Sequence, residues 1–279
     1  EKLHPNLWPK LRRSGAGKIV VMIHDLIPID FPQFTTPKST ANFGARMQAL
    51  TRHADFFIYN SSDTEQRMQR WFTKWDTSVD GRVVLLGTEP LPFTNAPPPS
   101  TTPYFVCVST IEPRKNHKLL LDIWAEFHAT LPENEIPHLH IVGRRGWLNK
   151  DVFNTLDTAP FMGKTVFEHS RMPDEQLGSL MKGTRALLFP SFTEGFGYPL
   201  VEALQMRVPV ICSDLPCFHE IAGDAPLYID IENQQKWRDK IREVATSDSI
   251  SKSLAIKIPE LPKWDSHFHN VDTILDDIS

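Results

Sequence analysis

Short apolar runs alternate with amphipathic stretches along most of the chain. In the first third of the sequence, three apolar runs predict strands, at 18–24, 56–60 and 83–87. The stretches between them predict helices over roughly 39–53 and 61–72. The second helix opens with a candidate capping box, in which Ser62 and Glu65 would satisfy each other's backbone amides.

A proline-rich segment interrupts this pattern at 89–103, where six prolines occur. Such a composition is stiff and extended, so we interpret the segment as a linker. Beyond it the alternation resumes, with expected helices from about residues 116, 173, 198 and 233 and a short helix between HLHIVG and TVFEH. The expected strands are YFVCV, HLHIVG, TVFEH, ALLFP, VPVIC and PLYID. Apolar strands that alternate with helices are typical of a parallel sheet covered on both faces.

The sequence therefore predicts an α/β protein with two Rossmann-like lobes. We expect an N-terminal lobe over 1–98 and a C-terminal lobe over 99–279. The first lobe offers only three convincing strands, so it is either compact or incomplete.

Composition and charge exclude several classes of protein. The 279 residues carry a formal net charge of −4, which argues against a nucleic-acid-binding protein. The three cysteines, Cys107, Cys212 and Cys217, lack metal-ligand spacing and indicate a reduced, cytoplasmic protein. No apolar run approaches the roughly 18–20 residues of a membrane span, although contact with a membrane surface stays open. We expect no metal site, because candidate ligands occur only in pairs, at His138 and His140, His267 and His269, and Asp230 and Glu232.

The stretch 192–214, FTEGFGYPLVEALQMRVPVICSD, carries the most informative motif. One interpretation is a dinucleotide site of an NAD-dependent oxidoreductase. A strand, a tight turn at Gly195 and Gly197, a helix, and Asp214 ending the next strand reproduce much of the Rossmann fingerprint. Leu200 argues against it, because it occupies the place of the third glycine.

The alternative interpretation uses two glutamates, Glu194 and Glu202, on either side of the turn. Backbone amides at a helix N-terminus suit an anion or a sugar hydroxyl. Glu194 would accept hydrogen bonds from hydroxyls at the turn. Glu202 would reach a second diol from the first helical turn, if Pro199 lies at or near the first helical position. Two carboxylates on two diols would hold a nucleotide sugar, whereas simple capping and solvation of the helix is the purely structural alternative.

A basic turn strengthens the nucleotide-sugar interpretation. Arg114 and Lys115 stand between the strand at 104–108 and the helix that begins near 116. A guanidinium and an ammonium at such a junction can clamp a diphosphate. Parallel-sheet proteins bind ligands at the carboxyl ends of their strands, where both turns are expected.

Together these motifs resemble the retaining glycosyltransferases of family 4, mannosyltransferases among them, which have the GT-B fold. The similarity runs from about residue 18 to the end. It is carried by EGFGYPLVE (194–202), which matches the family's E-x7-E motif, and by EPRKN (112–116), LHIVGRRGW (139–147), KWDSHF (263–268) and MIHDLIP (22–28).

The resemblance implies roles for individual residues. His24 and Glu194 would be the catalytic residues beside the transferred sugar, and Glu202 would hold the ribose. Arg114 and Lys115 would bind the diphosphate. Backbone amides facing the sugar would come from Gly195, Phe196 and Gly197.

The implied activity is transfer of a hexose, with mannose favoured, from a nucleoside diphosphate sugar to a hydroxyl of a glycan or lipid-linked glycan. The configuration would be retained, without metal or cofactor, in the cytoplasm or at the inner face of a membrane. The C-terminal segment would pack back towards the first lobe. Many family members have another basic residue where this chain has Ser109 and Thr110. A non-catalytic, nucleotide-binding relative is the alternative.

Overall fold

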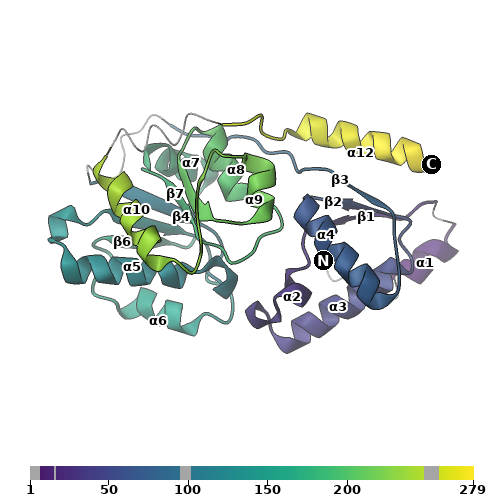
Figure 1. Cartoon of the computed structure of the whole chain (residues 1–279), viewed down its shortest axis with the longest axis horizontal. Helices are drawn as coiled ribbons and strands as arrows, with labels where there is room; N and C mark the ends of the chain where they lie inside the picture. The colour runs from purple at the N-terminus through teal and green to yellow at the C-terminus, as the bar shows by residue number, and fades with distance from the viewer. Residues whose placement is uncertain (1–6, 16, 95–101, 248–257) are drawn as a thin grey trace. The chain divides into compact units, whose positions relative to one another are not determined.

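The computed structural model describes residues 7–15, 17–94, 102–247 and 258–279. They form two compact units (Figure 1). The first unit comprises Glu1–Thr88, Glu194–Phe196 and Pro262–Ser279, and the second comprises Glu89–Thr193 and Gly197–Leu261. The proline-rich segment begins with the second unit, where Thr94 N donates to Ser179 Oγ over 3.0 Å. Its residues 95–101 lie outside the described part of the chain.

The first unit contains a three-stranded parallel sheet in the order β1-β2-β3. The strands are β1 (Val20–Ile23), β2 (Phe56–Tyr59) and β3 (Gly81–Val83). The helices are α1 (Leu7–Arg13), α2 (Ile27–Asp30), η1 (Pro32–Phe34), α3 (Pro37–Thr51), α4 (Ser62–Trp75) and α12 (Trp264–Ile278).

Both faces of this sheet are covered, so all four residues of β2 are buried. Side chains alternate between the faces of a strand. Phe57 and Tyr59 therefore pack in a cluster with residues of α1, α3 and α4. Phe56 and Ile58 pack on the opposite face with α12, whose Ile274 is 2 % exposed. The C-terminal helix thus covers one face of the first unit's sheet.

The second unit contains six parallel strands in the order β6-β5-β4-β7-β8-β9. They are β4 (Tyr104–Val108), β5 (His138–Val142), β6 (Val166–His169), β7 (Leu187–Phe189), β8 (Val210–Ser213) and β9 (Leu227–Ile229). The helices are η2 (Pro113–Lys115), α5 (His117–Thr130), η3 (Glu133–Glu135), α6 (Lys150–Thr158), α7 (Asp174–Gly183), α8 (Tyr198–Gln205), α9 (Pro216–Ala222) and α10 (Gln234–Thr246). This is the Rossmann strand order, and it confirms the predicted α/β fold.

The strand order reverses between β4 and β7, since β5 and β6 extend the sheet on one side and β8 and β9 on the other. The main core of the second unit lies where α5, α6 and α10 pack on the sheet, around Trp124 and Trp237. Ligands of open α/β sheets bind outside the carboxyl ends of the strands at this switch point. The fold therefore directs attention to the loops after β4 and β7.

Two local predictions were wrong. The third strand is Gly81–Val83 rather than 83–87. Val84 N still donates to Tyr59 O over 2.8 Å, and the Val84 side chain packs with Phe56, Ile58 and Ile274 beyond the end of the strand. The cap of α4 is Ser61, whose hydroxyl accepts from Thr64 N, one residue before the predicted Ser62. Helices α1, α2 and α9 were not predicted from the sequence.

Candidate active site

The basic turn lies at the switch point of the second unit's sheet. It forms η2, between β4 and α5. Lys115 is only 8 % exposed, and its Nζ lies 5.2 Å from the centre of the Phe189 ring at the end of β7. The ammonium group is therefore held near the carboxyl ends of β4 and β7, where the fold favours a ligand.

Lys115 acts electrostatically on the buried groups around it. Burial, and secondarily the charge of Lys115, lower the pKa of His117 to about 3, so this imidazole is neutral at physiological pH. Burial raises the pKa of the Cys107 thiol to about 12 against the opposing effect of Lys115. The His117 imidazole and the Cys107 thiol are thus uncharged, and the positive charge beside them is that of Lys115.

Arg114 links the basic turn to the loop that leads to Glu194. Its Nη1 donates to the Thr193 carbonyl oxygen over 3.2 Å, and its own carbonyl oxygen accepts from Phe192 N over 2.8 Å. Its Nε forms an ion pair with Glu112 at 2.5 Å. The structure thus brings together the two motifs that the sequence separates by nearly 80 residues.

Glu194 ends this loop and is 8 % exposed. Just before it, the side chains of Ser191 and Thr193 are 0 % and 1 % exposed, and their hydroxyls make no hydrogen bond within the described residues. Such buried polar groups call for a ligand or a bound water. Neither residue is among those predicted from the sequence, although a serine and a threonine two positions apart before Glu194 are a readable signal.

The glycines of the turn leave no room for side chains. A Cβ at Gly195 would lie 2.1 Å from the His24 carbonyl oxygen in the first unit, to which Gly195 also belongs. The Gly195 carbonyl oxygen accepts from Ser61 Oγ over 2.9 Å. Gly197 adopts φ 105° and caps α8. The backbone of His24 therefore lies against Gly195 of the turn.

Glu202 lies on α8 and is half-buried. Helix α8 begins at Tyr198, so Pro199 is its second residue and Glu202 its fifth. Because a helical turn holds 3.6 residues, Glu202 lies just past the first turn, and the prediction that places it on that turn is wrong. Burial, and then the charge of Asp174 at the start of α7, raise the pKa of Glu202. Hydrogen bonds donated by ligand hydroxyls would stabilise this carboxylate.

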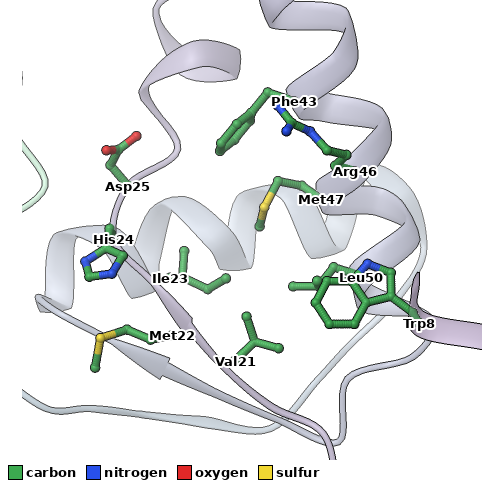
Figure 2. A pocket seen from close by; sticks show the side chains of 10 residues that line it. All are labelled: Trp8, Val21, Met22, Ile23, His24, Asp25, Phe43, Arg46, Met47 and Leu50. Atoms are coloured by element: carbon green, nitrogen blue, oxygen red, sulfur yellow. The ribbon is translucent and has the colours of Figure 1, made fainter. Parts of the chain in front are cut away.

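His24 is exposed and lies at one end of a pocket of about 290 Å³ in the first unit (Figure 2). Figure 2 shows β1 residues facing α3, with Trp8 at the far end and Asp25 beside His24. The lining is apolar apart from His24, Asp25 and Arg46. A pocket with aromatic walls and a few polar groups suits a small polar ligand with an apolar face.

Residues 93–258 match the family model described as "Glycosyl transferases group 1". This match covers more than half of the chain. The chain belongs to the group 1 glycosyltransferases.

Among curated relatives, the serotype-specific mannosyltransferase WbdA of Escherichia coli is 31% identical over 254 residues, which are 82% of this chain and 31% of WbdA. The O-antigen chain mannosyltransferase B of Escherichia coli is 32% identical over 161 residues, 54% of this chain and 41% of the relative. The chain thus spans about a third of the length of WbdA.

Solved glycosyltransferase structures share the fold, which confirms the predicted GT-B architecture. The sucrose-phosphate synthase of Thermosynechococcus elongatus aligns with a TM-score of 0.78 at 18% identity, over 98% of this chain and 71% of that one. The Anabaena protein HepE, solved with UDP and glucose, aligns with a TM-score of 0.70 at 17% identity, over 97% of this chain and 76% of that one.

Membership of the glycosyltransferase family argues against the interpretation of the stretch 192–214 as a dinucleotide site of an NAD-dependent oxidoreductase. The structure also argues against a dinucleotide site, because Leu200 is fully buried where a dinucleotide-binding chain has its third glycine. Asp214, the expected ribose ligand of that alternative, is paired with His219 at 2.6 Å.

The described residues include no cluster of three or more His, Cys, Asp or Glu side chains suited to a metal ion. His140 instead contacts His169, with 3.0 Å between Nδ1 and Nε2. His267 Nδ1 donates to the Leu85 carbonyl oxygen. No helix in the described ranges has the length and apolar character needed to cross a membrane.

Proposed function

We propose that this glycosyltransferase moves a hexose, with mannose as the favoured sugar, from a nucleoside diphosphate sugar to a hydroxyl of a glycan or lipid-linked glycan, with retention of configuration. The proposal rests mainly on one observation. Lys115, the orphaned hydroxyls of Ser191 and Thr193, and the Glu194 turn follow β4 and β7, the two strands at the switch point. The names of the mannosyltransferase relatives support the sugar and the glycan acceptor.

In this proposal, the donor lies with its diphosphate near Lys115 and its sugar at the turn. Lys115 offers a point charge, while Arg114 positions the turn through Thr193. Glu194 and the amides of Gly195, Phe196 and Gly197 take the sugar hydroxyls. Glu202 accepts hydrogen bonds from the ribose diol, and these bonds stabilise its half-buried carboxylate.

Transfer breaks the bond between the anomeric carbon and the diphosphate oxygen, and forms a bond from the same carbon to the acceptor oxygen. The motifs that carry the family resemblance supply no protein nucleophile, so we assign a front-face path. The departing phosphate oxygen then takes the proton of the acceptor hydroxyl. Lys115 and the N-terminus of α8 stabilise the charge that grows on the diphosphate.

We assign the acceptor to the first unit, next to His24. The support is the pocket of about 290 Å³ lined by His24, Asp25 and Trp8. A sugar ring can place its apolar face on an aromatic side chain and its hydroxyls on the polar ones.

The test is incubation of the protein with a panel of nucleoside diphosphate sugars, followed by measurement of nucleoside diphosphate release with and without glycan acceptors. Acceptor-dependent release that persists in excess EDTA supports a metal-independent transferase. Binding of nucleotides without any release would identify a non-catalytic relative. Release that stops in EDTA and returns with manganese would contradict the metal-free step.

A further inference from the structure

Two polar side chains, those of Asn60 and Ser61, directly follow β2 in the first unit, and only 2 % and 0 % of their surfaces are exposed. Polar side chains this deeply buried are found where they have hydrogen-bonded partners. The partners here include backbone carbonyl groups of two other segments. One belongs to His24, after β1, and the other to Gly195, in the turn that follows Glu194.

Asn60 fixes the backbone at His24. The backbone pairing of β1 with β2 ends at Ile23 and Tyr59, so His24 and Asn60 are the first residues past its end. Asn60 Nδ2 donates to the His24 carbonyl oxygen over 2.8 Å. The side-chain amide thus extends the connection between the two strands by one residue, and it holds the chain at the point where the His24 side chain begins.

Ser61 fixes the turn. Its hydroxyl accepts from Thr64 N over 3.2 Å as the cap of α4, and it donates to the Gly195 carbonyl oxygen over 2.9 Å. Capping requires only an acceptor, and aspartate caps a helix as well as serine, with glycine only slightly worse. Neither an ionised aspartate nor a glycine has a side-chain hydrogen to donate to a carbonyl oxygen. The need for a hydroxyl at this position therefore comes from the turn and not from the helix.

The two segments that these side chains hold also touch each other. A Cβ at Gly195 would lie 2.1 Å from the His24 carbonyl oxygen, so the backbones of the two residues are in close contact. With the hydrogen bonds from Asn60 and Ser61, this contact closes a contact triangle of three segments, all within the first unit. No segment of the triangle can shift without losing a contact to another.

The Asn60 amide leaves its second polar atom without a partner. Oδ1 is buried and makes no hydrogen bond within the described residues. A buried polar atom without a partner destabilises a protein, and leucine has nearly the same size without any polar atom. Such an atom is typical of a functional site or of a bound water rather than of a core.

We propose that Asn60 and Ser61 are positioning residues of the transfer reaction. Asn60 holds His24 and Ser61 holds Gly195, so that the imidazole and the amides of the turn keep the spacing that the transferred sugar requires. This inference rests on the proposed function. Reacting groups must be held within about 0.5 Å of the productive geometry, and a displacement of about 1 Å can lower a rate on the order of a hundredfold.

A loosened contact triangle should affect the sugar and not the diphosphate, which the proposed function places near Lys115. The hydroxyl of a large acceptor must meet the anomeric carbon in one orientation, whereas water can reach it from many directions. In hydrolysis, water forms the new bond to the anomeric carbon and its proton goes to the departing diphosphate. The ratio of free hexose to elongated glycan should therefore rise. This ratio does not depend on how much of the protein is folded.

The experiment compares the wild type with Asn60→Leu, Ser61→Gly and Ser61→Thr. Asn60→Leu removes the amide donor at nearly constant size, Ser61→Gly keeps most of the capping effect, and Ser61→Thr keeps the hydroxyl. The matched controls lie in the same unit. Thr51→Val removes a side-chain hydrogen bond within α3, and Thr36→Gly removes the side-chain cap of that helix.

The donor is guanosine diphosphate mannose, or the member of the panel of nucleoside diphosphate sugars with the fastest turnover, and the acceptor is a mannose trisaccharide. We expect the ratio of free hexose to elongated glycan to rise about tenfold in Asn60→Leu and Ser61→Gly. Affinity for the nucleoside diphosphate should stay within about twofold of the wild type. Ser61→Thr and both controls should keep the wild-type ratio. Without ligand, Ser61→Gly should speed amide hydrogen exchange in the peptide 192–198.

Each contrary result has its own meaning. A wild-type ratio in Asn60→Leu and Ser61→Gly, with an active wild type, would refute the positioning role while the proposed function stands. A parallel loss of nucleoside diphosphate affinity would also overturn it, because the two residues would then support the whole site. Unchanged hydrogen exchange in Ser61→Gly would refute the hold on the turn, whatever the activity. A wild type that consumes no sugar nucleotide of the panel would contradict the proposed function, and the positioning role with it.

Discussion

Gly197 joins the sugar-binding turn to the helix of Glu202, and its replacement by alanine gives a sharp test of the local geometry. Its φ of 105° lies in a region that L-residues rarely adopt. A Cβ there would lie 2.6 Å from Cε1 of Phe218, which is 0 % exposed and stacks on Phe189 at 5.2 Å. The Phe218 ring has little freedom to move away.

The expected cost has two parts. A side chain at positive φ costs about 1–2 kcal/mol. Overpacking against a buried ring costs about a further 1–3 kcal/mol. Together they amount to roughly 2–5 kcal/mol, a large part of the roughly 5–15 kcal/mol that stabilises a typical domain.

Gly163→Ala is the matched control, because Gly163 has φ 74° but no atom within 4 Å of its would-be Cβ. It should show only the backbone part, and the entropy change of the unfolded chain is common to both variants. Urea denaturation, followed by the fluorescence of the buried Trp124 and Trp237, would measure both. Equal losses of stability at the two positions would refute the argument that Phe218 fills the space beside Gly197.

Three further predictions concern charge, pH and the C-terminal helix. Lys115→Met keeps the buried aliphatic part of the side chain and removes its charge. It should weaken nucleoside diphosphate binding by about 1.5–3 kcal/mol and leave nucleoside binding unchanged in titration calorimetry. Equal losses of affinity for both ligands would mean that the turn has only a structural role. Burial, and secondarily the neighbouring His169, lower the pKa of His140 to about 4. As pH falls from about 6.5 towards 4, His140 is therefore protonated in the unfolded chain but stays neutral in the folded chain. Stability should fall across this window, and His140→Phe should reduce the slope measured by denaturation at several pH values; an unchanged slope would contradict the assignment. Gly87→Ala places a Cβ 2.2 Å from Trp264 N and should raise amide hydrogen exchange in α12, and unchanged protection would contradict this packing.

The sequence predicted the second unit well because its strands are short, continuously apolar and separated by long helices. The same rule misplaced β3, since an apolar run can be buried by a helix as well as by a sheet, as Val84 is by α12. Helix α9 was missed because its seven residues are too few to show helical periodicity. The cap of α4 was assigned to the wrong one of two adjacent serines, a choice that backbone geometry makes.

At the site, the sequence indicated residue types and left their partners undetermined. It paired the basic turn with the glutamate turn through the rule on strand ends, and the contact between Arg114 and Thr193 follows that rule. It gave no partner for Arg145, which forms ion pairs with Asp157 and Glu168, each at 2.7 Å.

The central claim is that Glu194 and Glu202 act on different parts of one donor. Its most direct test is titration of Glu194→Gln and Glu202→Gln with a nucleoside diphosphate sugar and with the corresponding nucleoside diphosphate. Glu194→Gln should slow transfer and weaken the sugar nucleotide while leaving the diphosphate affinity nearly intact. Glu202→Gln should weaken both ligands by about 1–2 kcal/mol. If both variants lose stability and bind the two ligands like the wild type, the glutamates only support the helix and the donor-site assignment is wrong.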